Sequence, residues 1–537
     1  MDRQQQIAQL RSDQFDVLII GGGITGVGIA LDARARGLNT ALIEMNDFAS
    51  GTSSKSTKLI HGGLRYLKQF EFGLVGEVGR ERAVVHRIAP HLVHPDKMLL
   101  PLIKGGNYGK WLTSLGLKIY DWLAEVRGSD RRRMLSRSET ANAEPLLRTD
   151  ILEGGGLYAE YRTDDSRLVV SVARTAARMG ALVVNYLSAC EFSYSQGKVS
   201  GVVARDEISG EEVRIDAKCV VNATGPWVDE LRSKEGELSG KRLHLTKGVH
   251  LVVSRNKLPL KQTVYFDNQD GRMIFAVPRG RAVYLGTTDT DFTGDKSSIS
   301  ASGEDVEYIL SACNHMFPNA HLAPTDVESS WAGVRPLIHE DGKNASALSR
   351  KDELFESPTG LISIAGGKLT GYRKMAERVV DRVVKRLGAP FGKCTTDRIQ
   401  LVGGEFANYE EVGALIDALY RDYSQLITER STAEYLVHNY GTESRSILES
   451  ATRLNESPEV ALALAEAEFT IDHEMVVHGL DYFERRTGRL NFNVPGIPKI
   501  RERVLQLMAQ KLNWTRERLQ WEENALDQAL KRTKSFS

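Results

Sequence analysis

The stretch over residues 16–44, DVLIIGGGITGVGIALDARARGLNTALIE, limits the possible folds of this chain more than any other segment. It begins with an apolar run, residues 17–20, that has the length and β-branched content of a buried parallel strand. Gly21, Gly23 and Gly26 follow at the G-x-G-x-x-G spacing. The first glycine permits a tight turn, the second lets the backbone approach a pyrophosphate, and the third lets a helix lie close to the strand.

The second half of the same stretch completes the pattern. Apolar residues recur at helical spacing over residues 24–36, Gly37 is suited to end the helix, and residues 40–43 form a second apolar strand. Glu44 then lies 18 residues after Gly26, where an acidic side chain can accept hydrogen bonds from a ribose hydroxyl pair. This order of strand, glycine turn, helix, second strand and acidic residue predicts a dinucleotide site. It does not distinguish FAD from NAD.

Composition limits the class of protein and its partners. A chain of 537 residues is too long for one core and suggests about three domains. Lys plus Arg (70) equals Asp plus Glu (70), so no nucleic-acid partner is expected. The four cysteines form no C-x-x-C, which argues against a structural zinc site or a disulfide framework and favours a reducing, cytoplasmic compartment. We predict no metal site.

A polar segment, MNDFASGTSSKSTKLIHGGLRYLKQF, comes directly after Glu44. It could be an ordinary solvated loop, but segments at the carboxyl ends of parallel strands face the ligand crevice. Its hydroxyls, with Lys55 or Lys58, are therefore predicted to bind pyrophosphate. The residues expected next to the reactive ring are His61, Arg65 and Tyr66.

Residues 110–137 combine an apolar helix face with a basic tail, RRRMLSR. This pattern is typical of an interfacial helix on an anionic lipid surface. A core helix followed by a solvated loop fits the same periodicity.

Two later segments end in glycine-rich turns that suit the same ligand. An apolar strand ends in Ala223, Thr224 and Gly225, and the strand at residues 361–365 leads into a glycine pair and a helix from about Thr370. A helix N-terminus directed at the pyrimidine edge of an isoalloxazine would stabilise the reduced flavin. Because an NAD site has little use for this third element, it favours FAD.

The predicted fold class is α/β, a Rossmann-like FAD-binding domain with an inserted, mainly antiparallel β-sheet substrate domain and a C-terminal α-helical domain. Residues 156–185 are expected to form a turn, a helix and a strand, and residues 243–295 carry the strand signals of the inserted sheet. The FAD-binding domain is predicted over residues 1–80, 150–240 and 330–392. The substrate-binding or cap domain takes residues 81–149 and 241–329, and the helical domain takes residues 393–537.

With these segments in order, the chain resembles the aerobic, FAD-dependent glycerol-3-phosphate dehydrogenases, a branch of the glycine oxidase and D-amino-acid oxidase fold group. The motifs that carry the resemblance are GGGITG, SSKSTKLIHGGLRYL, ATGPWVDEL, KGVHLVV, YLGTTDTDFTGD, AGVRPL and AGGKLTGYRK. The resemblance implies a cytoplasmic enzyme, peripheral on the inner face of the cell membrane. It implies oxidation of sn-glycerol 3-phosphate to dihydroxyacetone phosphate by hydride transfer to flavin N5, with electrons passed to a membrane quinone. A homodimer is possible.

The residues predicted to bind FAD are Gly21, Gly23, Gly26, Glu44, Ser53, Ser54, Lys55, Ser56, Thr57, Gly62, Ala223, Thr224, Gly225, Gly366, Gly367, Lys368, Leu369 and Thr370. One departure from the family pattern is Gly371, where Thr or a similar residue is expected.

The resemblance also places candidates for substrate binding and catalysis. The predicted substrate-binding residues are Arg65, Tyr66, His250, Arg335 and Arg373, and the predicted catalytic residues are His250, Arg335, Lys368, Arg65 and His61. A phosphate needs guanidinium groups or lysines in a water-poor site, which suits the arginines. Histidine titrates in the range useful for removing the C2 hydroxyl proton, so His250 is the first choice of base and His61 the second.

Other interpretations of these residues remain open. His250 could be a hydrogen-bonded core residue of an alternating strand, and Lys368 could polarise the flavin or bind a substrate oxygen. The same fold would also suit an oxygen-using oxidase of glycerol 3-phosphate or of an amino acid. A flavin-binding assembly protein without turnover is a third possibility.

Overall fold

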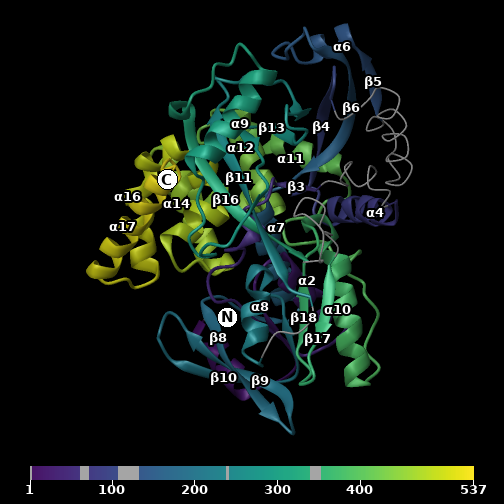
Figure 1. Cartoon of the computed structure of the whole chain (residues 1–537). Coiled ribbons are helices and arrows are strands. Elements are labelled where there is room, and N and C mark those ends of the chain that lie inside the picture. Colours follow the sequence, from purple (N-terminus) through teal and green to yellow (C-terminus); the bar gives the residue numbers. More distant parts are fainter. Residues whose placement is uncertain (1–2, 61–71, 107–131, 237–240, 339–351, 537) are drawn as a thin grey trace.

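The computed structural model describes residues 3–60, 72–106, 132–236, 241–338 and 352–536. Two β-sheets and a group of C-terminal helices make up this part of the chain (Figure 1). The α/β fold class and the helical C-terminal domain are as predicted from the sequence.

The first sheet is built on the nucleotide-type stretch. Its strand order is β17-β18-β10-β1-β2-β7, and β1 (Gln14–Ile20) pairs in parallel with β2 (Thr40–Ile43) and with β10 (Glu212–Asn222). Its other strands are β7 (Leu182–Val184), β8 (Leu187–Ser195), β9 (Lys198–Asp206), β17 (Glu353–Glu356) and β18 (Ile362–Ala365). β8 and β9 extend the sheet from β10 as an antiparallel hairpin.

Helices α2 (Ile24–Ala35), α7 (Asp165–Arg178) and α10 (Tyr372–Leu387) share one buried apolar cluster with this sheet. Close packing of α2 on α10 depends on Gly28, because a Cβ there would lie 2.9 Å from the Tyr372 ring. The shorter helices beside the sheet are α1 (Arg3–Ser12) and α8 (Val228–Ser233).

The second sheet has the order β15-β11-β14-β13-β12-β4-β6-β3, with β16 also paired to β11 and β5 to β6. All of its pairs are antiparallel except β12 with β4. Its strands are β3 (Leu59–Ile60), β4 (His94–Ile103), β5 (Arg133–Ser136), β6 (Leu152–Arg162), β11 (Leu243–Ser254), β12 (Thr263–Asp267), β13 (Met273–Arg279), β14 (Ala282–Gly286), β15 (Thr290–Asp291) and β16 (Val327–Ile338). Helix α9 (Gly303–Met316) packs on this sheet through a second apolar cluster, and α6 (Arg137–Ala143) follows β5.

Three strands of this sheet, β3, β6 and most of β16, lie in segments that the sequence assigned to the FAD-binding domain. β6 runs through the segment predicted to begin with a turn at residue 156 and pairs with both β4 and β5. β16, which the predicted boundary at residue 330 divides, pairs with β11 along most of its length. Pairing with distant strands decides which sheet each of these strands joins. The local sequence pattern does not reveal such pairing.

The C-terminal helices enclose two apolar clusters of their own. They are α11 (Tyr409–Asp422), α12 (Arg430–Tyr440), α13 (Ser444–Ala451), α14 (Pro458–Glu474), α15 (Arg489–Phe492), α16 (Ile497–Lys511) and α17 (Arg516–Arg532). A π-helical turn, η8 (Asp481–Arg486), connects α14 with α15. These helices meet the second sheet where α15 contacts β16, and they meet the first sheet's helix α7 through α14 and η8.

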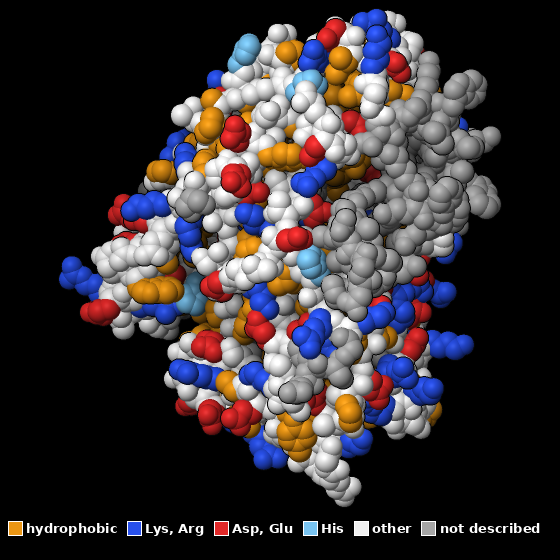
Figure 2. Space-filling view, viewed as in Figure 1, with side chains coloured by type: hydrophobic (Ala, Val, Ile, Leu, Met, Phe, Trp, Pro, Cys, Tyr) orange, Lys and Arg blue, Asp and Glu red, His pale blue; other side chains and the backbone are white. Residues whose placement is uncertain are grey.

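Among the described residues, no helix has the length and apolar content needed to cross a membrane. Most of the segment predicted as an interfacial helix lies outside the described residues, which resume within its basic tail, where Arg133 begins β5. The long helix before it is α4 (Phe72–Ile88). On the face shown in Figure 2, basic and acidic side chains are interspersed over the described surface, in keeping with the balanced composition.

Candidate active site

A cavity of about 880 Å³ lies at the carboxyl ends of β1, β2, β10 and β18 and extends to the facing strands of the second sheet. This is the edge of a parallel sheet at which nucleotides bind. Its volume is in the range of a site for an organic ligand. The sequence placed the dinucleotide site at this edge.

The glycine turn after β1 forms one wall of the cavity. Gly21 has φ +116°, and a Cβ there would lie 2.8 Å from the carbonyl carbon of Ala223. Gly23 precedes α2 and lies beside Ser53, whose Oγ accepts a hydrogen bond from the Ile24 N–H at 3.0 Å. Gly26 does not line the cavity; a Cβ there would collide with the Gly21 carbonyl, so this glycine sets the distance between helix and strand.

Glu44 is held at the end of β2 by two backbone groups. Its carboxylate accepts hydrogen bonds from the N–H of Gly22 at 2.6 Å and of Asn46 at 2.9 Å. The side chain lines the cavity although the residue is only 8% exposed, and burial raises its pKa. A carboxylate oxygen has two lone pairs, so these bonds leave acceptor capacity for a ribose hydroxyl.

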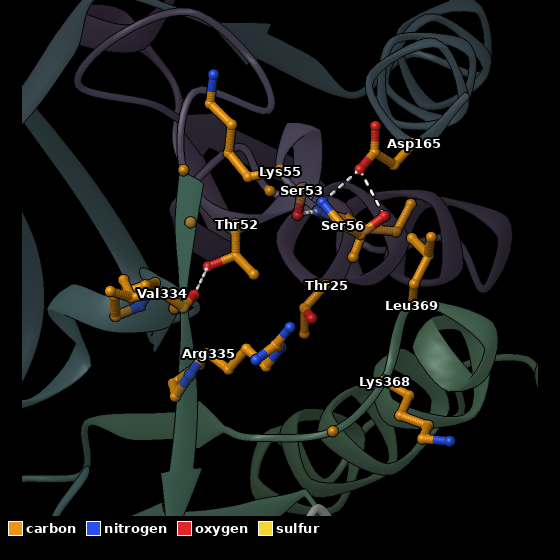
Figure 3. Close-up of a pocket in the computed structure, with 18 of the residues that line it drawn as sticks. Thr25, Thr52, Ser53, Lys55, Ser56, Asp165, Val334, Arg335, Lys368 and Leu369 are labelled. Atoms are coloured by element: carbon orange, nitrogen blue, oxygen red, sulfur yellow. Dashed lines mark hydrogen bonds between the residues drawn. The ribbon is translucent and has the colours of Figure 1, made fainter. Parts of the chain in front are cut away.

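The polar loop after Glu44 lines the cavity mainly through hydroxyl-bearing residues. Thr52 Oγ1 donates to the Val334 carbonyl at 2.7 Å, and Ser56 Oγ donates to Asp165 at 2.6 Å (Figure 3). Thr57 lines the cavity as well, whereas the Ser54 side chain is turned to the Gly51 carbonyl and does not.

Both lysines of this loop are held in ion pairs, and of the two only Lys55 lines the cavity. The ammonium of Lys55 leads away from Arg335 in Figure 3 and forms an ion pair with Glu484. The ammonium of Lys58 is buried in an ion pair with Asp165. Carboxylates from elsewhere in the chain thus engage both cations, and the binding of pyrophosphate by a lysine of this loop stays a prediction. The N–H groups and dipole at the start of α2 remain to hold an anion.

The other two predicted glycine-rich turns meet at the same cavity. Ala223, Thr224 and Gly225 line it from the end of β10, and residues 366–370 line it from the end of β18. Gly366 and Gly367 have φ +78° and +83°, a conformation that favours glycine. Gly371 precedes α10, and a Cβ there would meet no atom within 4 Å, so the fold accepts either glycine or a larger residue at this departure from the family pattern.

Arg335 is the predicted substrate residue that the structure places in the cavity most clearly. It lies on β16 and points into the cavity (Figure 3). Its guanidinium donates to Thr287 Oγ1 at 2.9 Å, to the Thr288 carbonyl at 3.2 Å and to Asp289 at 3.0 Å. Gly248 on the neighbouring strand makes room for it, because a Cβ there would lie 2.6 Å from Cζ. Lys368 lines the cavity too, with its side chain directed away from Arg335.

His250 lies in the wall of the cavity rather than on its surface. It is 1% exposed, its ring stacks on Trp331 at 4.9 Å, and its Nε2 hydrogen-bonds with Thr57 Oγ1 at 3.0 Å. Burial, followed by the charges of Arg335 and Lys58, lowers its pKa well below the usual value, so the ring is neutral. Thr57 therefore stands between His250 and the cavity.

Arg373 lies outside the cavity. Its guanidinium is buried in a bidentate pair with Glu81 of α4, at 3.0 and 2.7 Å, and also donates to Thr396. The prediction that it binds substrate is corrected, because its position in the first turn of α10 directs it toward α4. His61, Gly62, Arg65 and Tyr66 lie outside the described residues.

The second sheet brings to the cavity residues that were not predicted from the sequence. Arg272 lines it from the turn between β12 and β13, and the rings of Tyr265 and Phe275 stack beside it with centroids 4.1 Å apart. The only signal in the sequence is the Asp270-Gly271 turn before Arg272. That turn predicts a hairpin but not its proximity to a ligand.

Comparison with known proteins agrees with this geometry. A family model described as FAD dependent oxidoreductase matches residues 16–372, and one described as the C-terminal domain of alpha-glycerophosphate oxidase matches residues 394–519. The aerobic glycerol-3-phosphate dehydrogenases of Staphylococcus saprophyticus and Bacillus subtilis are 47% and 46% identical to this chain. The alignments cover 96% and 98% of this chain and 94% and 95% of those proteins.

Solved structures give the same result. The glycerol-3-phosphate dehydrogenase from Bacillus halodurans complexed with FAD matches with a TM-score of 0.85 and 44% identity, over 99% of this chain and 98% of that one. A glycine oxidase from Geobacillus kaustophilus, 22% identical with a TM-score of 0.53, covers 71% of this chain and 97% of its own and shares the fold alone. FAD, rather than NAD, is therefore the cofactor. The chain belongs to the FAD-dependent aerobic glycerol-3-phosphate dehydrogenase family.

Proposed function

We propose that this protein oxidises sn-glycerol 3-phosphate to dihydroxyacetone phosphate with bound FAD as the oxidant. The observation that carries the proposal is the Arg335 guanidinium, which three hydrogen bonds hold in the cavity that also contains the nucleotide turn. A cation fixed in this way suits a small phosphate ester better than a neutral alcohol.

The described residues fit FAD. The N–H groups at the start of α2 suit the pyrophosphate, Glu44 suits the ribose, and the start of α10 beyond the glycine pair suits the edge of the ring. The bound flavin supplies the acceptor for the hydride that leaves C2 of the alcohol.

Binding of the phosphate calls for more than Arg335. Asp289 takes up part of the Arg335 charge in an ion pair at 3.0 Å. A phosphate of nearly two negative charges therefore gains from a second cation. Arg272 is our candidate, since it lines the same cavity and is only loosely paired with Asp270, at 3.6 Å.

Removal of the C2 hydroxyl proton is assigned to His250 acting through Thr57. The neutral ring can accept a proton, and the Thr57 hydroxyl, 3.0 Å from Nε2, lines the cavity. In this arrangement the substrate hydroxyl would donate its proton to Thr57 Oγ1 while the Thr57 hydroxyl donates its own proton to Nε2. In this role Thr57 relays the proton and His250 accepts it.

The test begins with the visible spectrum. Purified protein should be yellow and should bleach on anaerobic addition of glycerol 3-phosphate. Arg335→Met should keep the FAD spectrum while raising KM for glycerol 3-phosphate by at least about tenfold, because a charge-assisted contact is lost. A protein that takes up no FAD, or whose flavin glycerol 3-phosphate does not reduce, contradicts the proposal.

We further propose that electrons pass to a membrane quinone. The family names of the relatives support a dehydrogenase, while the match to an alpha-glycerophosphate oxidase C-terminal domain favours oxygen as the second candidate acceptor. Turnover with a soluble quinone analogue should greatly exceed turnover with oxygen. Equal or faster turnover with oxygen would identify an oxidase instead.

Attachment to an anionic lipid surface on the inner face of the cell membrane, and a homodimer, complete the proposal. The basic tail of residues 132–137 supports the attachment. The protein should float with anionic vesicles in a manner that salt weakens. Vesicles that retain none of it would refute the attachment, and sedimentation at micromolar concentration tests the dimer.

A further inference from the structure

The loop over residues 45–58 lines the FAD cavity on one side and touches the C-terminal helices on the other. Its one regular element is the three-residue helix η1 (Thr52–Ser54). Two of its non-glycine residues, Ala49 and Lys58, have φ +62° and +56°. Such conformations cost on the order of 1–3 kcal/mol each and persist only where the surroundings enforce them. The loop therefore depends on outside contacts for its shape.

Asp47 is the main such contact. Its carboxylate is fully buried and accepts hydrogen bonds from Arg485 Nε at 2.6 Å and from Arg486 Nη1 and Nη2 at 2.7 and 2.8 Å. Asn185 donates to it as well, at 3.2 Å. Burial alone would raise the pKa of Asp47, but the two arginines outweigh burial and hold it well below the usual range. Asp47 is therefore ionised and tied to the turn η8.

The same turn holds the loop at a second point and is itself anchored. Glu484 pairs with Lys55, which lies ten residues after Met45, the first residue of the loop. Arg486 also donates to the Glu474 carbonyl, and the Glu474 carboxylate pairs with Arg167 at 2.5 and 2.8 Å. Arg167 belongs to α7, so the buried charges connect the C-terminal domain, the loop and the first sheet.

We propose that the turn η8 (Asp481–Arg486) is a functional part of the FAD site, with Arg485, Arg486 and Asp47 as positioning residues that hold the loop of residues 45–58 in its FAD-binding shape. The inference rests on FAD as the ligand of the cavity. It gives the C-terminal helical domain a role in retaining cofactor, beyond packing. No atom of η8 lines the cavity, so its effect passes through the loop.

The experiment measures FAD affinity in the full chain. Asp47→Asn keeps the shape of the side chain but removes the charge, and apoprotein should then bind FAD at least about tenfold more weakly by flavin fluorescence, the effect of losing charged hydrogen bonds. The gain in Tm that FAD gives should shrink as well. A merely structural role would lower the Tm of apoprotein and holoprotein alike.

The matched control is Glu466→Gln. Glu466 is also fully buried and pairs with Arg489 at 2.5 Å, but inside the C-terminal domain and away from the loop. It should lower Tm without changing FAD affinity. If it weakens FAD binding as much as Asp47→Asn does, the effect is general destabilisation and the proposal is overturned.

Arg485→Gln is the milder variant that decides the matter if Asp47→Asn does not fold. It leaves Arg486 to balance Asp47, and a loss of FAD affinity of about fivefold or more supports the proposal. FAD affinity within about twofold of wild type in either folded variant overturns it. Wild-type protein that fails to bind FAD would instead overturn the proposed function.

Discussion

Gly248→Ala tests whether the position of Arg335 governs substrate turnover. Gly248 lies on β11, opposite Gly333 of β16, and has no positive φ, so the backbone itself accepts alanine. The added Cβ would lie 2.6 Å from Cζ and 2.8 Å from Nη1 of Arg335. Nη2 would lie closer still, and an ordinary contact begins at 3.4 Å, so the guanidinium must move by more than about 0.8 Å.

That shift falls on a group held by three hydrogen bonds of 2.9 to 3.2 Å. A misplacement of about 1 Å at a positioning group costs roughly 100-fold in rate. We therefore expect kcat/KM for glycerol 3-phosphate to fall roughly 100-fold, equivalent to about 2.7 kcal/mol of transition-state stabilisation. The FAD absorbance of the purified variant should match wild type.

The assay is anaerobic reduction with a soluble quinone analogue as acceptor, with the FAD content measured on the same sample. Gly413→Ala is the control, because Gly413 lies in α11 and a Cβ there meets nothing within 4 Å. If Gly248→Ala keeps kcat/KM within about threefold of the control, Arg335 is either not fixed as the structure has it or does not bind the substrate.

Three further changes test other parts of the structure. Gly26→Ala should give protein without FAD, measured as flavin per chain, because its Cβ collides with a carbonyl of the glycine turn. Arg373→Met should lower the stability by about 3–5 kcal/mol, because it leaves Glu81 buried and unpaired, yet keep KM; a raised KM would restore Arg373 to the substrate site. Burial lowers the pKa of His91 to about 3 and of His438 to about 4. As the pH falls, the unfolded chain therefore takes up protons before the folded protein does. The free energy of unfolding should fall from pH 6.5 toward pH 4 by about 1.4 kcal/mol per pH unit for each histidine. Urea unfolding at pH 7.5 and 5 measures this dependence, and a pH dependence that is unchanged in His91→Leu would refute it.

The sequence alone determined the nucleotide half of the site. The residues predicted for the second strand are those of β2, and Gly21, Gly23 and Glu44 line the cavity as expected. The prediction succeeded because glycine is needed where the conformation or the close contacts of a turn exclude a Cβ, and such a turn is specified by a few neighbouring residues. The same holds for the glycine pair before α10, where both residues have positive φ.

Only the tertiary structure decided which charged groups are paired and which line the cavity. Lys55 looked suited to pyrophosphate, but its partner Glu484 lies 429 residues later in the chain. Arg373 likewise meets Glu81 across 292 residues, whereas Arg335 is turned into the cavity by the pairing of β16 with β11. Whether a cation is available depends on the carboxylates that the fold packs against it, and local sequence pattern carries no information about partners so distant.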